Sequence, residues 1–295
     1  MFRNRMSLAL LGGTLSVLLS VPIAAAPAVA PLEVDVKLVL ATDVSRSIND
    51  EEASLERQGT ADVFLDPDVV KAIQSGSLGR IAVAMIDWSS MRMDKVVLDW
   101  TIVRDKESAA ALAAKIRAIP RTPGERTSIS GALNRAMELL ADSDRYLVAE
   151  KKVIDVSGDG PNNDGISLQH VHDTTKDNGI IVNGLPIMDK DADGYYPDLD
   201  KYYDACVVAG KGAFLIPVLA FKDFGTAMRR KLVLEISQNE NQIRQALGDS
   251  EATPLLKLIA ATTAPPLGPR LQLNPPAKIY PGGCDKYGGY GVNGG

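Results

Sequence analysis

The chain has 295 residues, of which 45% are hydrophobic and 23% are charged, so it is long enough for one large α/β domain or two small ones. Its formal net charge of −5, with no basic block to reverse it, argues against nucleic acid as the main partner. Aromatic residues make up only 5% of the chain, which predicts a mostly aliphatic core.

The first thirty residues have the layout of a secretory signal peptide. Arg3 and Arg5 form a short basic region, an apolar stretch runs from Met6 to Val21, and small residues follow. The apolar stretch is shorter than a comfortable membrane span, which favours cleavage over a retained anchor, and we predict residues 1–28 as the signal peptide. Since no later stretch is long and apolar enough to cross a membrane, we expect a periplasmic or secreted bacterial protein.

Apolar stretches alternate with helix-forming stretches along the rest of the chain. The predicted strands are Val34–Thr42, Ile81–Ile86, Lys95–Val103, Lys152–Val156, Ile180–Leu185 and Ala213–Val218. The predicted helices cover residues 49–64 with a further turn to 73, then 106–119, 127–140, 167–178, 198–209 and 221–247. This alternation predicts an α/β fold with a doubly wound, mostly parallel sheet and helices on both faces. The short connection before Lys95–Val103 predicts one antiparallel edge strand.

We assign residues 29–248 to this domain and residues 249–295 to a C-terminal tail. Proline and glycine accumulate from Gly248 onward, which predicts an extended, partly disordered tail. The two cysteines, Cys206 and Cys284, are an even number in a chain expected to be exported, which favours a disulfide that ties the tail back to the domain. The alternative is that Cys206 is a small buried residue on a helix.

Polar side chains follow the ends of the predicted strands. Asp43, Ser45 and Ser47 come after the first strand, Asp159 follows a later strand, and Thr127 lies at the start of a helix. In a doubly wound sheet, ligands bind at the carboxyl ends of the strands, so we expect these side chains to meet at one edge. Hydroxyl and carboxylate oxygens suit Mg²⁺, Mn²⁺ or Ca²⁺ rather than zinc or copper. Any one of these residues alone is equally well explained by helix capping or strand termination.

These five residues, in this order, resemble the metal-ion-dependent adhesion site (MIDAS) of von Willebrand factor A domains. The resemblance implies that the Ser and Thr hydroxyls bind the metal directly. It also implies that Asp43 and Asp159 act largely through water and that an acidic group of a partner completes the coordination shell.

A narrower resemblance is to an exported bacterial family of von Willebrand factor A-like proteins, domain of unknown function 1194. Three stretches carry it: Arg126–Leu133, the pattern Asp200-x-Tyr202-Tyr203-x-x-Cys206, and Arg229–Glu235. The biochemical role of that family is not established, so this resemblance bears on the fold more than on the function.

A second acidic stretch matches the spacing of a calcium-binding loop. Asp189, Asp191, Asp193 and Asp200 occupy positions one, three, five and twelve, and Gly194 occupies position six. Asp at position twelve is shorter than the usual Glu, and a strand rather than a helix precedes the loop. We predict a structural Ca²⁺ site here, and the alternative is a solvated acidic loop.

Motifs of common enzyme classes are absent from the sequence. It contains no phosphate-binding loop and no Gly-x-Ser-x-Gly, and its two histidines, His170 and His172, lie two apart on a predicted helix. We therefore interpret the chain as a non-enzymatic module that binds an unidentified protein partner through Mg²⁺ or Mn²⁺. One alternative is a metal-assisted hydrolase of phosphate esters, which needs a general base that the sequence does not offer. Another is an exported scaffold without a functional metal.

Overall fold

The computed structural model describes residues 30–193, 195–237, 239–263 and 283–285. The predicted signal peptide, residues 1–28, lies outside the described residues. Within the described ranges, no helix has both the length and the apolar character that a membrane span requires.

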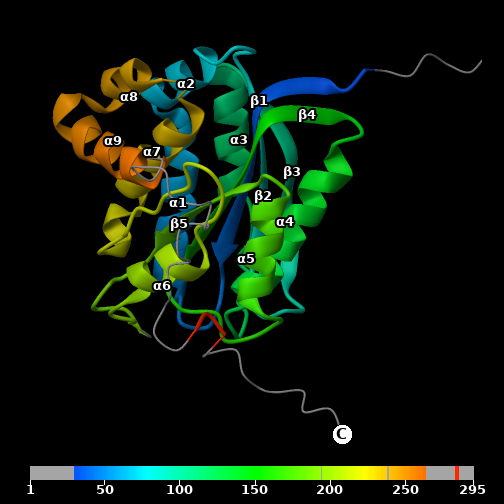
Figure 1. The fold of residues 1–295 in the computed structure, drawn as a ribbon, viewed down its shortest axis with the longest axis vertical. Coiled ribbons are helices and arrows are strands. Elements are labelled where there is room, and N and C mark those ends of the chain that lie inside the picture. Colours follow the sequence, from blue (N-terminus) through cyan, green and yellow to red (C-terminus); the bar gives the residue numbers. More distant parts are fainter. Residues whose placement is uncertain (1–29, 194, 238, 264–282, 286–295) are drawn as a thin grey trace, which may run out of the picture. The chain divides into compact units, whose positions relative to one another are not determined.

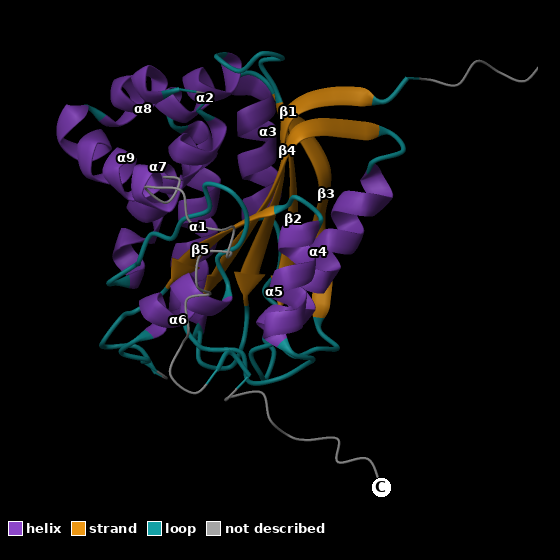
Figure 2. Ribbon diagram, in the orientation of Figure 1, coloured by secondary structure: helices purple, strands orange, loops and turns teal. Residues whose placement is uncertain are grey.

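A five-stranded sheet forms the centre of the domain, in the order β3-β2-β1-β4-β5 (Figures 1 and 2). Its strands are β1 (Leu32–Asp43), β2 (Ile81–Trp88), β3 (Asp94–Val103), β4 (Leu147–Gly158) and β5 (Ile181–Pro186). Pairing is parallel except between β2 and the edge strand β3, which are antiparallel. The predicted doubly wound, mostly parallel sheet with one antiparallel edge strand is therefore confirmed.

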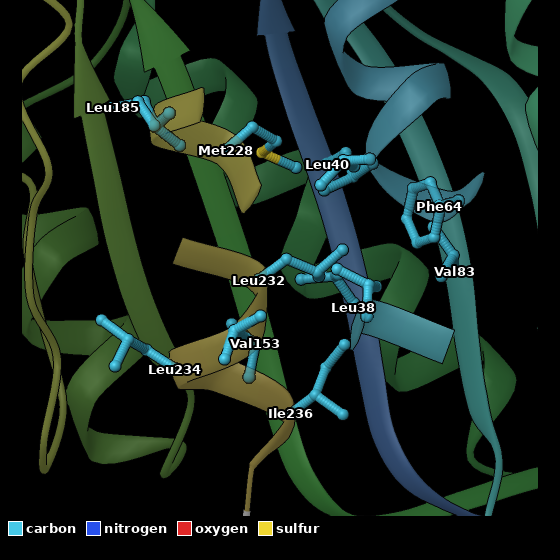
Figure 3. Packing of buried hydrophobic residues seen from close by; sticks show 14 of the residues in the cluster. Leu38, Leu40, Phe64, Val83, Val153, Leu185, Met228, Leu232, Leu234 and Ile236 are labelled. Carbon is cyan, nitrogen blue, oxygen red and sulfur yellow. The ribbon is translucent and has the colours of Figure 1, made fainter. Parts of the chain in front are cut away.

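Helices cover both faces of the sheet, and side chains of the central strand β1 alternate between the two layers. Leu38 and Leu40 belong to the core cluster shared with α1 (Asp50–Leu65), α2 (Pro67–Gln74), α3 (Lys106–Arg117) and α7 (Phe224–Ile236). Val39 and Ala41 belong to the cluster shared with α4 (Ile129–Ser143), α5 (Leu168–Asp177) and α6 (Leu199–Cys206). Figure 3 shows residues of the first cluster, with Leu232 of α7 lying close to Leu38.

Local signals fix the starts of several helices. Asn49 caps α1 through a capping box with Glu52. Asp66 caps α2 and Pro67 begins it, which explains the break after α1. Ser128, rather than Thr127, caps α4, because the Ser128 hydroxyl accepts the backbone N–H of Gly131 at 3.2 Å.

The prediction of a sixth strand at Ala213–Val218 is wrong. This segment lies beside β5 but forms only isolated bridges, between Gly184 and Leu215 and between Ile187 and Val218. The Phe214 N–H donates to the side chain of Asn183 at 2.9 Å instead of to a backbone carbonyl. The N–H groups of Ile216 and Val218 do donate to Gly184 and Pro186 of β5, at 3.0 and 2.9 Å, so the segment pairs with the sheet edge over a few residues without forming a strand.

The C-terminal part of the domain contains more helix than we expected. The helical stretch predicted over residues 221–247 is broken into η1 (Phe221–Asp223), α7 and α8 (Glu240–Leu247), and Asn239 caps the last of these. The expectation of an extended chain directly after Gly248 is wrong, because Asp249–Thr263 forms α9. That stretch contains one proline and no glycine, and its Leu, Ala, Glu and Lys residues favour helix. Residues 264–282 and 286–295 of the predicted tail lie outside the described residues.

Candidate metal site

The loop after β1 presents its oxygen atoms in a tight, buried arrangement. Asp43 ends the strand and is 1% exposed, and one of its carboxylate oxygens accepts the backbone N–H of Ser45 at 2.7 Å. The hydroxyls of Ser45 and Ser47 lie 3.2 Å apart. One carboxylate and two hydroxyls are thus held together at the carboxyl end of the central strand.

The loop after β4 brings Asp159 to the same place. The Ser47 hydroxyl donates to Asp159 Oδ1 at 2.8 Å, which joins the two loops directly. Thr127 exchanges two hydrogen bonds with Asn163, donating its N–H to Asn163 Oδ1 at 2.9 Å and accepting the Asn163 N–H at 2.8 Å. The Thr127 hydroxyl lies near Gly160, the residue next to Asp159. A Cβ placed on this glycine would be 3.7 Å from the hydroxyl. The structure therefore places all five predicted side chains at one edge of the sheet.

The two carboxylates of the site are buried without a compensating charge. Asp43 Oδ2 and Asp159 Oδ2 are both buried and have no hydrogen-bond partner among the described residues. Burial, together with the charge of Asp159, raises the pKa of Asp43 well above its usual value. Burial also raises the pKa of Asp159 to about 6, and the hydrogen bond from Ser47 opposes this rise. Two buried carboxylates with a free oxygen each, beside three hydroxyls, are a donor set that fits Mg²⁺ or Mn²⁺.

Sequence reasoning missed two buried groups directly beneath the site. Glu56 of α1 accepts a hydrogen bond from the Ser157 hydroxyl, and burial raises the pKa of Glu56 to about 7. The hydroxyl of Tyr203 in α6 is buried and has no hydrogen-bond partner within the described part of the chain. A Cβ on Gly158 would lie 2.9 Å from both that hydroxyl and Asp43 Oδ2. A signal existed for Glu56, because it lies four residues after Glu52 and four before Thr60, on the buried face of α1.

The residues of the predicted calcium loop are not gathered into a cluster. In the part of the chain that the structure describes, no three His, Cys, Asp or Glu side chains are arranged to hold a metal ion. Both oxygens of Asp189 accept backbone N–H groups, from Asp191 at 3.1 Å and from Phe221 at 2.9 Å. Asp200 lies within α6, and the calcium site with Asp191 and Asp193 stays a prediction. The MIDAS-like site differs because three of its five members are hydroxyls.

The two cysteines lie together, as the predicted disulfide requires. Cys206, the last residue of α6, is bonded to Cys284, and their Cα atoms are 5.4 Å apart. Both residues are buried.

Comparison with known families decides the membership of the chain. Residues 33–240 match the family model described as "Protein of unknown function (DUF1194)". The chain belongs to this family. No curated protein matches the DUF1194 chain.

Solved structures similar to the DUF1194 chain include a matrix protein, a pilus adhesin and a von Willebrand factor type A protein. Proximal thread matrix protein 1 from the mussel byssus, with a zinc-occupied MIDAS motif, has 15% identity and a TM-score of 0.49, covering 69% of this chain and 46% of that one. The pilus adhesin SpaC from Lactobacillus rhamnosus GG has 16% identity and a TM-score of 0.49, covering 69% and 30%. A von Willebrand factor type A protein from Catenulispora acidiphila has 14% identity and a TM-score of 0.47, covering 68% and 42%.

The DUF1194 chain spans less than half the length of each of these three structures. At this identity and TM-score the similarities say nothing about function. The fold is defined by the strand order and the helix layers of the chain itself.

Proposed function

We propose that this chain is a non-enzymatic module that binds a protein partner through a divalent cation, Mg²⁺ or Mn²⁺, at the edge of its sheet. Ser45, Ser47 and Thr127 would bind the cation directly, and Asp43 and Asp159 would act directly or through bound water. The observation that carries the proposal is the pair of buried carboxylates, each with one oxygen that accepts no hydrogen bond from the residues that the structure describes. When bound, the cation supplies a positive charge and a coordination position that an anionic group can fill.

Residues of the chain hold this donor set in place before any cation arrives. Asp43 orients the Ser45 backbone by accepting its N–H, and Ser47 fixes Asp159 by donating its hydroxyl proton. Asn163 holds Thr127 through two hydrogen bonds. Because these groups are already ordered, little conformational entropy is lost on binding.

The charges around the site support a partner that presents an acidic group. Arg46 lies between two of the proposed ligands, Arg126 directly precedes the third, and both are exposed. Arg92 is also exposed and lies in the β2–β3 turn, which the loop after β4 contacts through a hydrogen bond from the neighbouring Met91 N–H to Asp164 at 2.8 Å. Glu125 and Asp164 also lie at this edge, so the three arginines do not make it positive as a whole, but their exposed guanidinium groups can pair with an anionic group of a partner.

Calorimetric titration with Mg²⁺ and Mn²⁺ tests the cation site. We expect Asp43→Asn to weaken cation binding by about tenfold or more, because it removes a buried charge that favours the cation. Asp99→Asn, at an exposed position on β3, changes the net charge equally and is expected to bind like the wild type. Equal affinity in the wild type and Asp43→Asn would refute the assignment.

A pull-down from periplasmic extract tests the partner. We expect a protein that is retained in Mg²⁺, released by chelator and absent from an Asp43→Asn matrix. Charge reversal in Arg46→Glu should slow association with this partner most strongly at low salt, because exposed charges are screened as salt rises. Retention that is the same with and without chelator would contradict metal-dependent binding.

A further inference from the structure

Residues Gly283–Asp285 lie against the domain, although more than seventy residues separate them from α6. The Cys206–Cys284 disulfide anchors this segment to the end of α6. Asp285 adds a second anchor at the start of α5, where its carboxylate accepts the Ser167 hydroxyl and the Leu168 N–H, both at 2.7 Å. The segment therefore contacts both α6 and the start of α5, the helix that follows the loop after β4.

Tyr202 connects this segment to that loop inside the protein. Its side chain is fully buried, and its hydroxyl donates to the Cys284 carbonyl at 2.9 Å. The same hydroxyl accepts the backbone N–H of Asn162 at 3.2 Å. A single phenol oxygen thus joins the C-terminal segment to the loop that carries Asp159.

The loop after β4 also forms hydrogen bonds to the remaining side of the metal site, at Ser130 and Thr127. The Asn162 side-chain oxygen accepts the backbone N–H of Ser130, in the first turn of α4, at 3.0 Å. The next residue, Asn163, forms the two hydrogen bonds that hold Thr127. The path from Cys284 to Thr127 therefore runs through Tyr202 and two consecutive loop residues, and the hydrogen bonds to Asn162 along it are buried.

We infer that the disulfide-anchored segment Gly283–Asp285 is a positioning element of the metal site, which holds Asp159 and Thr127 in place through Tyr202 and the loop after β4. Without the anchor, the Tyr202 hydroxyl would lose the Cys284 carbonyl as an acceptor. The buried Asn162 N–H would then donate to a hydroxyl that is no longer held in position. The loop would then sample positions in which the donor oxygens are separated. The metal part of this inference rests on the proposed function; the support of the loop does not.

The same arrangement makes the site sensitive to thiol chemistry. A dithiol reductant can open the anchor by exchange, in which the reductant is oxidised to its own disulfide and the sulfurs of Cys206 and Cys284 each gain a proton. Because both cysteines are buried, reduction requires local opening of the segment. The reduced protein should therefore bind the cation more weakly than the oxidised protein.

The test uses the full chain without its signal peptide, oxidised and metal-free at the start. Free-thiol titration of the denatured, unreduced protein should find no reactive thiol, and two reactive thiols would overturn the inference at once. Mn²⁺ affinity is then measured for the wild type, the double variant Cys206→Ser/Cys284→Ser and Tyr202→Phe. Tyr146→Phe, at an exposed tyrosine outside both predicted metal loops, is the matched control. We expect a loss of about tenfold in the double variant, a loss of about threefold in Tyr202→Phe and none in the control.

Amide hydrogen exchange of the metal-free proteins separates loop support from general destabilisation. We expect peptides containing Asn162 and Asn163 to exchange about tenfold faster in Tyr202→Phe, while peptides from β1 keep the wild-type rate. Faster exchange throughout the domain, or unchanged exchange and affinity in Tyr202→Phe, would overturn the inference. If the wild type fails to bind Mn²⁺, the proposed function is wrong, and the exchange rates still decide whether the segment positions the loop.

Discussion

Two clusters of buried acids lie along the same strand, β4, and they are neutralised in different ways. In the inner cluster, the fully buried Lys231 of α7 contacts Asp155 and lies 2.5 Å from Glu235. Asn183 donates a further hydrogen bond to Glu235 at 2.8 Å. In the edge cluster, Asp159 and Asp43 form no ion pair with any Lys or Arg within the described ranges. One cluster contains its own cation, and the other does not.

The two clusters differ in where the charge that balances their acids comes from. Burial, together with the charge of Asp155, raises the pKa of Glu235 well above its usual value, although Lys231 opposes this rise. The ammonium of Lys231 lies against both acids of the inner cluster and comes from within the protein. For the edge cluster we propose that a cation from solution supplies the balancing charge.

Removing the internal cation should produce the largest effect. Lys231→Met leaves Asp155 and Glu235 buried without an ammonium, and we expect the free energy of unfolding to fall by about 3–5 kcal/mol. Urea denaturation measures this change. Lys222→Met, at an exposed lysine of η1, should change stability by no more than about 0.5 kcal/mol. Equal stabilities of the two variants would mean that Lys231 does not balance the inner cluster.

The two clusters also differ in how far the sequence reveals them. The edge cluster was predictable because Asp43, Ser45 and Ser47 follow an apolar run at its end, and the carboxyl ends of parallel strands meet in such folds. The pairing of Lys231 with Asp155 was not predictable, because it depends on how α7 packs across the sheet.

Packing also explains the remaining misses. Glu56 and Tyr203 reach the site from α1 and α6, and no local pattern states which of their neighbours they meet. The segment Ala213–Val218 has the composition of a strand, but the Asn183 side chain takes the N–H of Phe214, and the segment forms only isolated bridges to β5. Short-range patterns thus predicted elements and strand ends, while contacts between distant helices required the structure.

The pH dependence of stability should separate Glu56 from the inner cluster. Burial raises its pKa from 4.5 to about 7 in the folded protein, so the folded state binds more protons than the unfolded state between these values. The contribution of Glu56 to stability is therefore fully present below about pH 4.5 and is lost as pH rises to about 7, by on the order of 3 kcal/mol. In Glu56→Gln this part of the pH dependence should be absent.

Urea denaturation of the metal-free protein at several pH values between 4 and 8 measures the effect of Glu56→Gln. The exposed Glu150→Gln serves as the control and should follow the wild type. If the free energy of unfolding depended on pH in the same way in the wild type and in Glu56→Gln, Glu56 would not have the raised pKa that its burial produces.

The smallest expected effect is a change in the free energy of unfolding, and its sign should differ between the two clusters. Asp43→Asn keeps the oxygen that accepts the Ser45 N–H but removes a carboxylate buried beside Asp159. In chelator at pH 8 we expect this variant to be more stable than the wild type by about 1 kcal/mol, because a site kept for a ligand is destabilising when empty. Saturating Mg²⁺ should reverse the order, since a cation at a hundred times its Kd stabilises the wild type by about 2.7 kcal/mol. Lys231→Met should remain the less stable protein in both buffers. If the difference between Asp43→Asn and the wild type were the same with and without Mg²⁺, the edge cluster would be another structural cluster and not a cation site.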